Sequence, residues 1–76
     1  MLEAIGKELK VCRIRNELTL KEVAKNMELS IETLRRYERD SNGLSIEKLE
    51  RLLSYYNVDK QIFFDNVCAN MHGKDK

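Results

Sequence analysis

The chain has 76 residues, which is enough for one small domain. Hydrophobic residues make up 42% of it and charged residues 36%, a composition that is typical of a globular chain and excludes an intrinsically disordered one. The formal net charge is only +1, which excludes a uniformly basic surface but leaves room for a local basic patch. No apolar segment approaches the length of a membrane span.

The residues that commonly carry catalysis or bind metals are few and scattered. Cys12 and Cys68 are far apart, and with the single His72 they do not have the spacing of metal ligands. No nucleophile has a base at a recognisable spacing, and no glycine-rich phosphate loop is present. We therefore expect no metal, no cofactor and no enzymatic activity. The N-terminus lacks the continuous apolar run of a signal segment, because charged residues interrupt it. We therefore expect a cytoplasmic protein with reduced thiols.

The first predicted helix covers about Leu2 to Arg15. Its apolar residues recur at helical spacing and predict a buried stripe formed by Leu2, Ile5, Leu9 and Cys12. The chain has no proline and only three glycines, and it lacks an alternating apolar run between turn signals. These features predict an all-α fold.

Two short helices joined by a turn are predicted between Thr19 and Glu38. Thr19 is a candidate N-cap, and Glu22 three residues later completes a capping box. Ser30 is a second candidate N-cap. The apolar residues of this stretch predict the contact between the two helices, and they are Val23, Ala24, Met27, Leu29, Leu34 and Tyr37. The pattern is that of a helix-turn-helix whose second helix has an arginine-rich outer face.

A turn at residues 40–43 precedes a fourth helix, which Ser45 caps and Asn57 ends. Its predicted apolar face contains Ile46, Leu49, Leu52, Leu53 and Tyr56. Asp59 is a candidate cap for a short fifth helix with Ile62, Phe63 and Phe64. We predict one domain over residues 1–71 with a C-terminal dimerisation segment, followed by a polar tail over residues 72–76.

The spacing of Thr19, Val23, Ala24, Met27, Leu29, Ser30, Thr33, Leu34 and Glu38 resembles the lambda-repressor-like, Cro/Xre-type helix-turn-helix family. The resemblance covers roughly Ile5 to Phe64 and implies a compact five-helix fold. Within the family, the chain looks most like restriction–modification controller proteins or the DNA-binding domains of small repressors. The resemblance to this family implies that the helix from Ser30 to Arg39 lies in the major groove.

The resemblance implies that Ile31, Glu32, Arg35 and Arg36 face the bases. An arginine can form a bidentate contact with guanine, and Ile31 can pack on a thymine methyl group. Glu32 can accept from a cytosine amino group, but it also repels phosphate and can instead pair with a neighbouring arginine. The alternative for this face is a solvated charged surface, which most helices of such composition carry.

Phosphate contacts are expected from helix N-termini and nearby side chains. The candidates are Lys10, Arg13, Thr19, Lys21, Arg39, Asn42 and Ser45. For Thr19 and Ser45 the alternative is plain helix capping. The family also often pairs an arginine of its first helix with the glutamate that ends the recognition helix. Arg13 and Glu38 occupy these positions, and a structural ion pair is the expected main role of Arg13.

The chain departs from the family pattern at three positions. Leu20 stands where the family often has a glutamine that contacts phosphate or a base. Glu28 replaces the turn glycine and must tolerate a left-handed backbone at some cost. Glu17 stands where a glycine often precedes the position of Leu18.

Apolar residues near the C-terminus predict a homodimer interface formed by Tyr55, Tyr56, Phe63, Phe64, Val67 and Met71. The alternative is that all of them belong to the core of one chain, and Ile62 with one phenylalanine is expected to close that core. The leading hypothesis is a dimeric, sequence-specific transcriptional regulator that binds a double-stranded DNA operator. The alternative hypothesis is a protein-interaction module on the same fold, such as an antirepressor or an adaptor that docks a protein regulator.

Overall fold

The computed structural model describes residues 2–73, and the side chains of residues 2–70; this part of the chain contains five helices and no strand. The helices are α1 (Leu2–Arg15), α2 (Leu20–Asn26), α3 (Ile31–Asp40), α4 (Ile46–Tyr55) and α5 (Lys60–Gly73). The predicted all-α, five-helix architecture is confirmed. No helix in the described part of the chain is both long and apolar enough to cross a membrane.

The predicted caps begin four of the five helices. The Oγ1 atom of Thr19 accepts from the backbone N–H of Glu22, and the Glu22 carboxylate accepts from the Thr19 N–H, which completes the capping box. Ser30 and Ser45 accept in the same way at α3 and α4. Asp59 accepts from two backbone N–H groups at the start of α5. These local hydrogen bonds explain why the helices begin where the sequence predicts.

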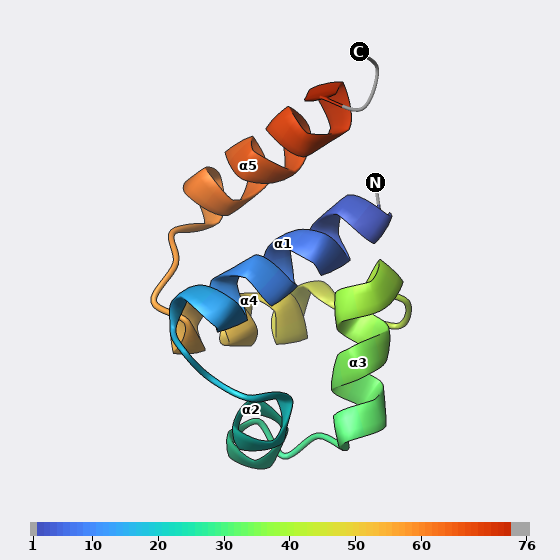
Figure 1. The fold of residues 1–76 in the computed structure, drawn as a ribbon, viewed down its shortest axis with the longest axis vertical. Coiled ribbons are helices and arrows are strands. Elements are labelled where there is room, and N and C mark those ends of the chain that lie inside the picture. Colours follow the sequence, from blue (N-terminus) through green and yellow to red (C-terminus); the bar gives the residue numbers. More distant parts are fainter. Residues whose placement is uncertain (1, 74–76) are drawn as a thin grey trace.

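Helix α1 lies at the centre of the molecule, with α3 crossing one end and α5 running alongside it (Figure 1). The α1–α3 crossing is very close, because a Cβ atom at Gly6 would lie 2.7 Å from the Tyr37 carbonyl oxygen. The core between the helices consists of Ala4, Leu9, Cys12, Val23, Ala24, Leu34, Tyr37, Leu49, Leu52, Leu53, Tyr56, Phe63 and Val67. The crossing at Gly6 fixes α3 directly on α1.

Three residues that were predicted to be buried are exposed. Leu2 and Ile46 lie in the first turns of α1 and α4, and they are 59% and 70% exposed. Ile62 is 58% exposed, because the neighbouring Phe63 occupies the side of α5 that faces the core. Phe63 is therefore the phenylalanine that closes the core, and the prediction for Ile62 is wrong.

The predicted dimer interface requires correction at three positions. Tyr56, Phe63 and Val67 are buried in the core of this chain and present no surface to a partner. Tyr55 is half-buried, and its hydroxyl accepts from the Asn26 amide of α2 at 2.7 Å. Phe64 is exposed. The predicted contact of the Met71 side chain lies outside the described residues.

Helix α5 has 14 residues and is much longer than predicted. Its inner face also carries polar side chains, because the buried Glu8 carboxylate of α1 accepts from the amides of Asn66 and Asn70. Helix α5 continues through Gly73, so the predicted tail over residues 72–76 begins inside this helix. Residues 74–76 lie outside the described residues.

Left-handed backbone conformations end four of the helical segments. The φ angles of Glu17, Glu28, Ser41 and Asn57 lie between 53° and 59°. The expectation of a left-handed backbone at Glu28 is therefore met, and Glu17 shows the same conformation. Such a conformation costs a non-glycine residue roughly 1–2 kcal/mol.

Candidate nucleic-acid interface

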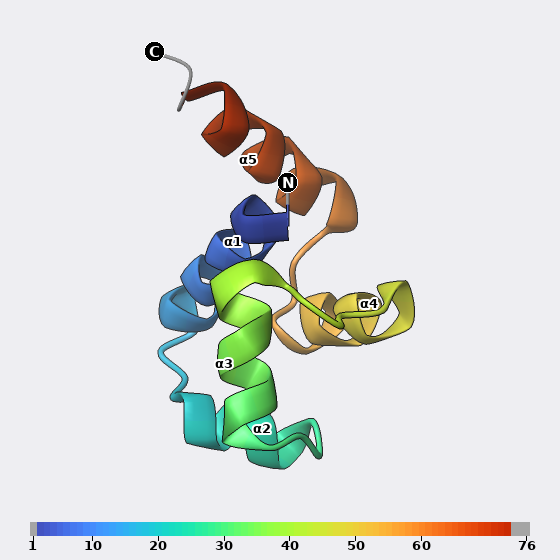
Figure 2. The same cartoon turned by 90° about the vertical axis from the view of Figure 1, so that its right-hand side faces the viewer.

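Helix α3 has one face in the core and one face in solvent. Leu34, Tyr37 and Glu38 are buried, whereas the exposed side chains are Ile31, Glu32, Arg35, Arg36 and Arg39. Figure 2 shows α3 in front, with α2 below it and α4 beside it. All four residues that were predicted to face bases therefore lie on the accessible face of α3.

The turn between α2 and α3 sets the position of α3. Glu28 adopts a left-handed conformation, and the backbone N–H of Leu29 donates to the Ala24 carbonyl at 2.8 Å. Val23 and Ala24 of α2 are buried together with Leu34 of α3. The two helices and their short turn form a helix-turn-helix, as the sequence predicts.

An ion pair between Arg13 and Glu38 joins α1 to the end of α3. The Nε atom of Arg13 donates to Oε2 of Glu38 at 2.8 Å, and Nη2 donates to Oε1 at 3.2 Å. A third bond runs from Nη1 to the Leu18 carbonyl at 2.9 Å. The two side chains are 12% and 6% exposed. The guanidinium of Arg13 is thus used mainly for helix packing, and little of it faces a phosphate.

A surface hollow of about 400 Å³ lies between α1, the start of α2 and α3. Its lining residues are Lys10, Arg13, Leu20, Arg35, Glu38 and Arg39. Glu38 is neutralised by Arg13, so Lys10, Arg35 and Arg39 give the hollow a net positive charge. The structure therefore brings four predicted DNA contacts from two helices, Lys10, Arg13, Arg35 and Arg39, into one basic site. Leu20 supplies an apolar wall where the family often has glutamine.

Arg36 is held against the turn that follows α3. Its Nε atom donates to the Asn42 carbonyl at 3.2 Å, and its Cζ atom lies 5.9 Å from the centre of the Tyr37 ring. Gly43, whose φ angle of 79° favours glycine, lies beside this guanidinium, and a Cβ atom there would make an ordinary van der Waals contact with Nη2 at 3.7 Å. The two terminal nitrogens of Arg36 are therefore placed by the turn, whereas Arg35 points into the basic hollow.

Asp40 is an acidic neighbour of these arginines whose importance the sequence analysis missed. Its carboxylate accepts from the Asn42 backbone N–H at 3.0 Å and from Arg39 Nε at 3.2 Å. The Asn42 hydrogen bond, and then the contact with Arg39, lower the pKa of Asp40 below its usual value. The sequence signal for this arrangement is an aspartate two residues before a turn residue whose backbone N–H can donate to its carboxylate. The Asn42 N–H is therefore occupied and is not free for a phosphate.

At the start of α2, the Glu22 carboxylate already occupies the position that a bound phosphate would take. The Glu22 carboxylate accepts from both the N–H and the hydroxyl of Thr19, at 3.2 and 3.1 Å. A phosphate that approached Thr19 would compete with this carboxylate. Lys21 is exposed beside it, and Ser45 caps α4 at a separate place. For Thr19 and Ser45 the structure thus shows the capping role.

Comparison with known proteins agrees with this geometry. A family model described as a helix-turn-helix domain matches residues 4–61, which include most of α1, all of α2 to α4 and the start of α5. The search of curated proteins and the search of solved structures gave no match. Helix-turn-helix domains bind DNA through their second motif helix, which corresponds to α3. The match covers well over half of the chain, and the chain therefore belongs to this helix-turn-helix domain family, within the Cro/Xre-type class.

Proposed function

We propose that the protein is a sequence-specific transcriptional regulator that binds operator DNA as a homodimer, with the exposed face of α3 in the major groove. The observation that carries this proposal is the basic hollow beside α3, in which Lys10, Arg35 and Arg39 lie together. These three cations are clustered at one place on a protein whose formal net charge is only +1, and such a cluster attracts phosphate. The helix-turn-helix then directs the start of α3 toward the bases.

The proposed base contacts come from the first turns of α3. Ile31 and Glu32 are exposed at its N-terminal end and can reach a thymine methyl group and a cytosine amino group. Arg36 has two terminal nitrogens available for guanine while its Nε is anchored on Asn42. A bidentate contact of this kind discriminates against a wrong base by roughly 1–3 kcal/mol.

The proposed phosphate contacts flank this face. Lys10, Arg35 and Arg39 would hold one strand at the basic hollow, and Lys21 would add charge at the start of α2. This reassigns Arg35 from a base contact to a phosphate contact, because its side chain lines the hollow. Phosphate contacts set the register of the protein on DNA without reading its sequence.

The test begins with selection of bound sites from random double-stranded DNA. Fluorescence anisotropy then compares the selected site with a scrambled one for Arg35→Ala, Arg36→Ala and the control Arg15→Ala. Arg15 lines a crevice between α1 and α5, on a different side of α1 from α3. We expect Arg36→Ala to lose discrimination between the two DNAs. We expect Arg35→Ala to weaken both equally and to reduce the salt dependence by about one phosphate contact.

Binding that is independent of salt, or the same loss of affinity in Arg15→Ala as in Arg35→Ala and Arg36→Ala, would refute this assignment. A second candidate function is a protein-interaction module, and the acidic side chains on this face favour it. Glu22 occupies the start of α2, and Glu32 is exposed among the proposed base contacts. Failure of the selection to enrich any DNA at low salt, with tight binding to a protein regulator, would support this second function.

A further inference from the structure

The turn between α3 and α4 contains an asparagine that is followed directly by a glycine. Asn42 and Gly43 lie in the short connection after the end of α3, and both are exposed (Figure 2). The backbone nitrogen of the residue after an asparagine can attack the side-chain amide carbon of that asparagine, which closes a five-membered succinimide ring. Glycine favours this attack, because no side chain hinders its nitrogen. The reaction therefore depends on whether the two reacting groups are free.

Both reacting groups of this pair are free of hydrogen bonds in the described part of the chain. Asn42 uses its backbone N–H for Asp40 and its backbone carbonyl for Arg36, whereas its side-chain amide has no partner among residues 2–70. The backbone N–H of Gly43 has no acceptor within the same residues. The nitrogen and the amide carbon can therefore approach each other without breaking a hydrogen bond.

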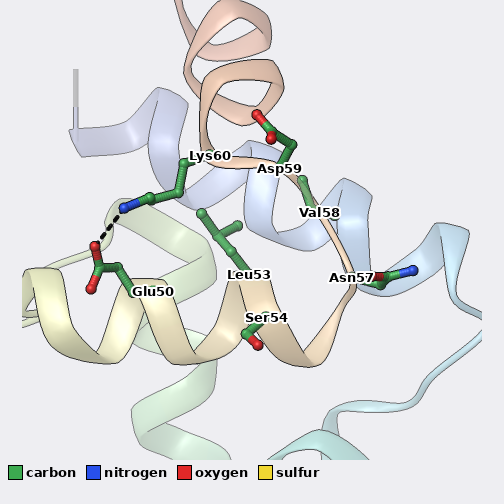
Figure 3. Close-up of a pocket in the computed structure, with 7 residues that line it drawn as sticks. All are labelled: Glu50, Leu53, Ser54, Asn57, Val58, Asp59 and Lys60. Carbon is green, nitrogen blue, oxygen red and sulfur yellow. Dashed lines mark hydrogen bonds and ion pairs between the residues drawn. The ribbon is translucent and has the colours of Figure 1, made fainter.

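Asn57 provides a comparison within the same chain. It is also exposed, and Figure 3 shows it at the end of α4, followed by Val58 in the turn to α5. The branched side chain of Val58 crowds its own nitrogen. The Val58 N–H also donates to the Leu53 carbonyl at 2.8 Å, so an attack on Asn57 would have to break this bond. Asn57 should therefore persist under conditions in which Asn42 reacts.

Arg36 lies beside the reacting peptide group. The attacking nitrogen must lose its proton, and the resulting negative charge is shared with the carbonyl oxygen of the same peptide group. That oxygen belongs to Asn42, and Arg36 Nε donates to it at 3.2 Å. The Nη2 atom of Arg36 lies 3.7 Å from the place that a Cβ atom on Gly43 would take. A cation in this position stabilises the anion and so favours the attack.

We propose that Asn42 deamidates spontaneously and that Arg36 promotes the reaction. The Gly43 nitrogen forms a bond to Cγ of Asn42 and gives its proton to water, while the bond from Cγ to Nδ2 breaks and ammonia leaves. Water then opens the succinimide at either of its carbonyl carbons, which gives aspartate or isoaspartate. The net reaction consumes water, releases ammonia and adds one negative charge, without oxidation or reduction.

The products would disturb the position of Arg36. Isoaspartate adds a methylene group to the backbone of the turn that holds this side chain, and either product adds a carboxylate to the same turn. Arg36 is the proposed guanine contact, and a new anion near it also repels phosphate. This consequence rests on the proposed function, whereas the modification itself does not. Aged protein should therefore bind its DNA less tightly than fresh protein.

The first test follows the modification by mass spectrometry. The protein is incubated at neutral pH, and trypsin, which cleaves after lysine and arginine, then releases the peptide 40–48. Deamidation adds about 1 Da to this peptide, and electron-transfer fragmentation distinguishes isoaspartate from aspartate. We expect at least about tenfold faster conversion at Asn42 than at Asn57, whose following N–H is hydrogen-bonded. Equal rates at the two asparagines, or no conversion of Asn42, would overturn the proposal.

The second test examines the role of Arg36. We expect Arg36→Met to slow the conversion of Asn42 several-fold, because the uncharged side chain no longer stabilises the anion. Arg35→Met is the matched control, since Arg35 lines the basic hollow and not the turn, and it should leave the rate unchanged. Circular dichroism melting verifies that both variants remain folded. An unchanged or faster conversion in Arg36→Met would show that Arg36 does not promote the reaction.

The third test measures how ageing affects DNA binding. Fluorescence anisotropy compares fresh and aged protein on the selected site, and we expect the loss of active protein to equal the converted fraction. Asn42→Gln should lose none relative to its own fresh sample, because its longer side chain would have to close a larger ring. Complete conversion without loss of affinity would overturn the effect on recognition and leave the modification intact. Fresh protein that binds no DNA would instead overturn the proposed function.

Discussion

Arg13 of α1 binds both carboxylate oxygens of Glu38 of α3, at 2.8 and 3.2 Å, and the two side chains are almost completely removed from solvent. The pair joins the first helix to the helix that is proposed to enter the major groove. Since α3 also packs on α1 at Gly6, the pair and the helix crossing together fix the angle of α3. Stability and the proposed recognition of DNA therefore depend on the same contact.

We expect Glu38→Leu to destabilise the fold by about 3–5 kcal/mol, because it leaves the Arg13 guanidinium buried without its counter-ion. Arg13→Met should also destabilise it, since Glu38 would lose its cation. The double variant Arg13→Met/Glu38→Leu should recover much of the loss. Urea denaturation of the four proteins gives the coupling energy. Additive losses in the double variant would show that the pair is not an energetic unit.

Gly6→Ala should destabilise the protein, although the same change inside a helix normally stabilises it by roughly 0.5–1 kcal/mol. The added methyl group would lie 2.7 Å from the Tyr37 carbonyl oxygen and 2.8 Å from that of Glu38, so α1 and α3 would have to separate. The expected cost is about 1–3 kcal/mol. Thermal melting should show a lower midpoint for Gly6→Ala, whereas Ser54→Ala, at an exposed position of α4, should not show it.

Tyr56→Phe should leave the free energy of unfolding unchanged or raise it by up to about 1 kcal/mol. The Tyr56 hydroxyl is buried and has no hydrogen-bond partner among the described residues. Burial, followed by the nearby Glu38 charge, raises the pKa of this phenol. Chemical denaturation measures the change. A clear loss of stability would indicate that the hydroxyl makes a bond through a bound water molecule.

Asp40→Asn should tighten DNA binding several-fold at low salt, because it removes an anion from beside Arg39 and Arg36, and the gain should shrink as salt screens the charges. The lowered pKa of Asp40 keeps this carboxylate charged throughout the neutral range. Its contribution to folding is present above the ordinary aspartate pKa of about 3.9 and is lost as the pH falls through the lower folded value.

Carboxyl-detected NMR titration measures the Asp40 pKa, and anisotropy at two salt concentrations measures the gain in affinity. An affinity that Asp40→Asn leaves unchanged at low salt would place Asp40 away from the bound phosphates.

The sequence predicts those parts of the fold that depend on neighbours along the chain. The N-caps of α2, α3 and α4, and the end of α4 at Asn57, follow from side chains that bond to nearby backbone or accept a left-handed turn. The arginine face of α3 follows from helical spacing alone. These features need no knowledge of which helix packs against which.

Other features depend on contacts between distant segments, and the sequence pattern hides them. The sequence predicts a short α5 with Ile62, Phe63 and Phe64, yet the helix continues past Asn66 and Asn70, whose amides donate to the buried Glu8 carboxylate of α1. The hydrogen bond from Arg36 to the Asn42 carbonyl likewise forms only in the folded chain. The same is true of the basic hollow, which Lys10 and Arg35 line from two different helices. For the close crossing of α1 and α3, the sequence signal is a glycine, Gly6, in the interior of a helix.

The left-handed residues at the ends of the helices have a consequence for the evolution of this chain. Glu17, Glu28, Ser41 and Asn57 each hold a conformation that glycine adopts freely, and three of them are exposed. A single change to glycine at Glu17, Glu28 or Asn57 would thus be tolerated and could offset a harmful substitution elsewhere. Ser41 lacks this freedom, because its hydroxyl donates to the Leu2 carbonyl at 2.8 Å. A substitution on the exposed face of α3 that destabilises the fold can therefore be compensated by a glycine at Glu17, Glu28 or Asn57.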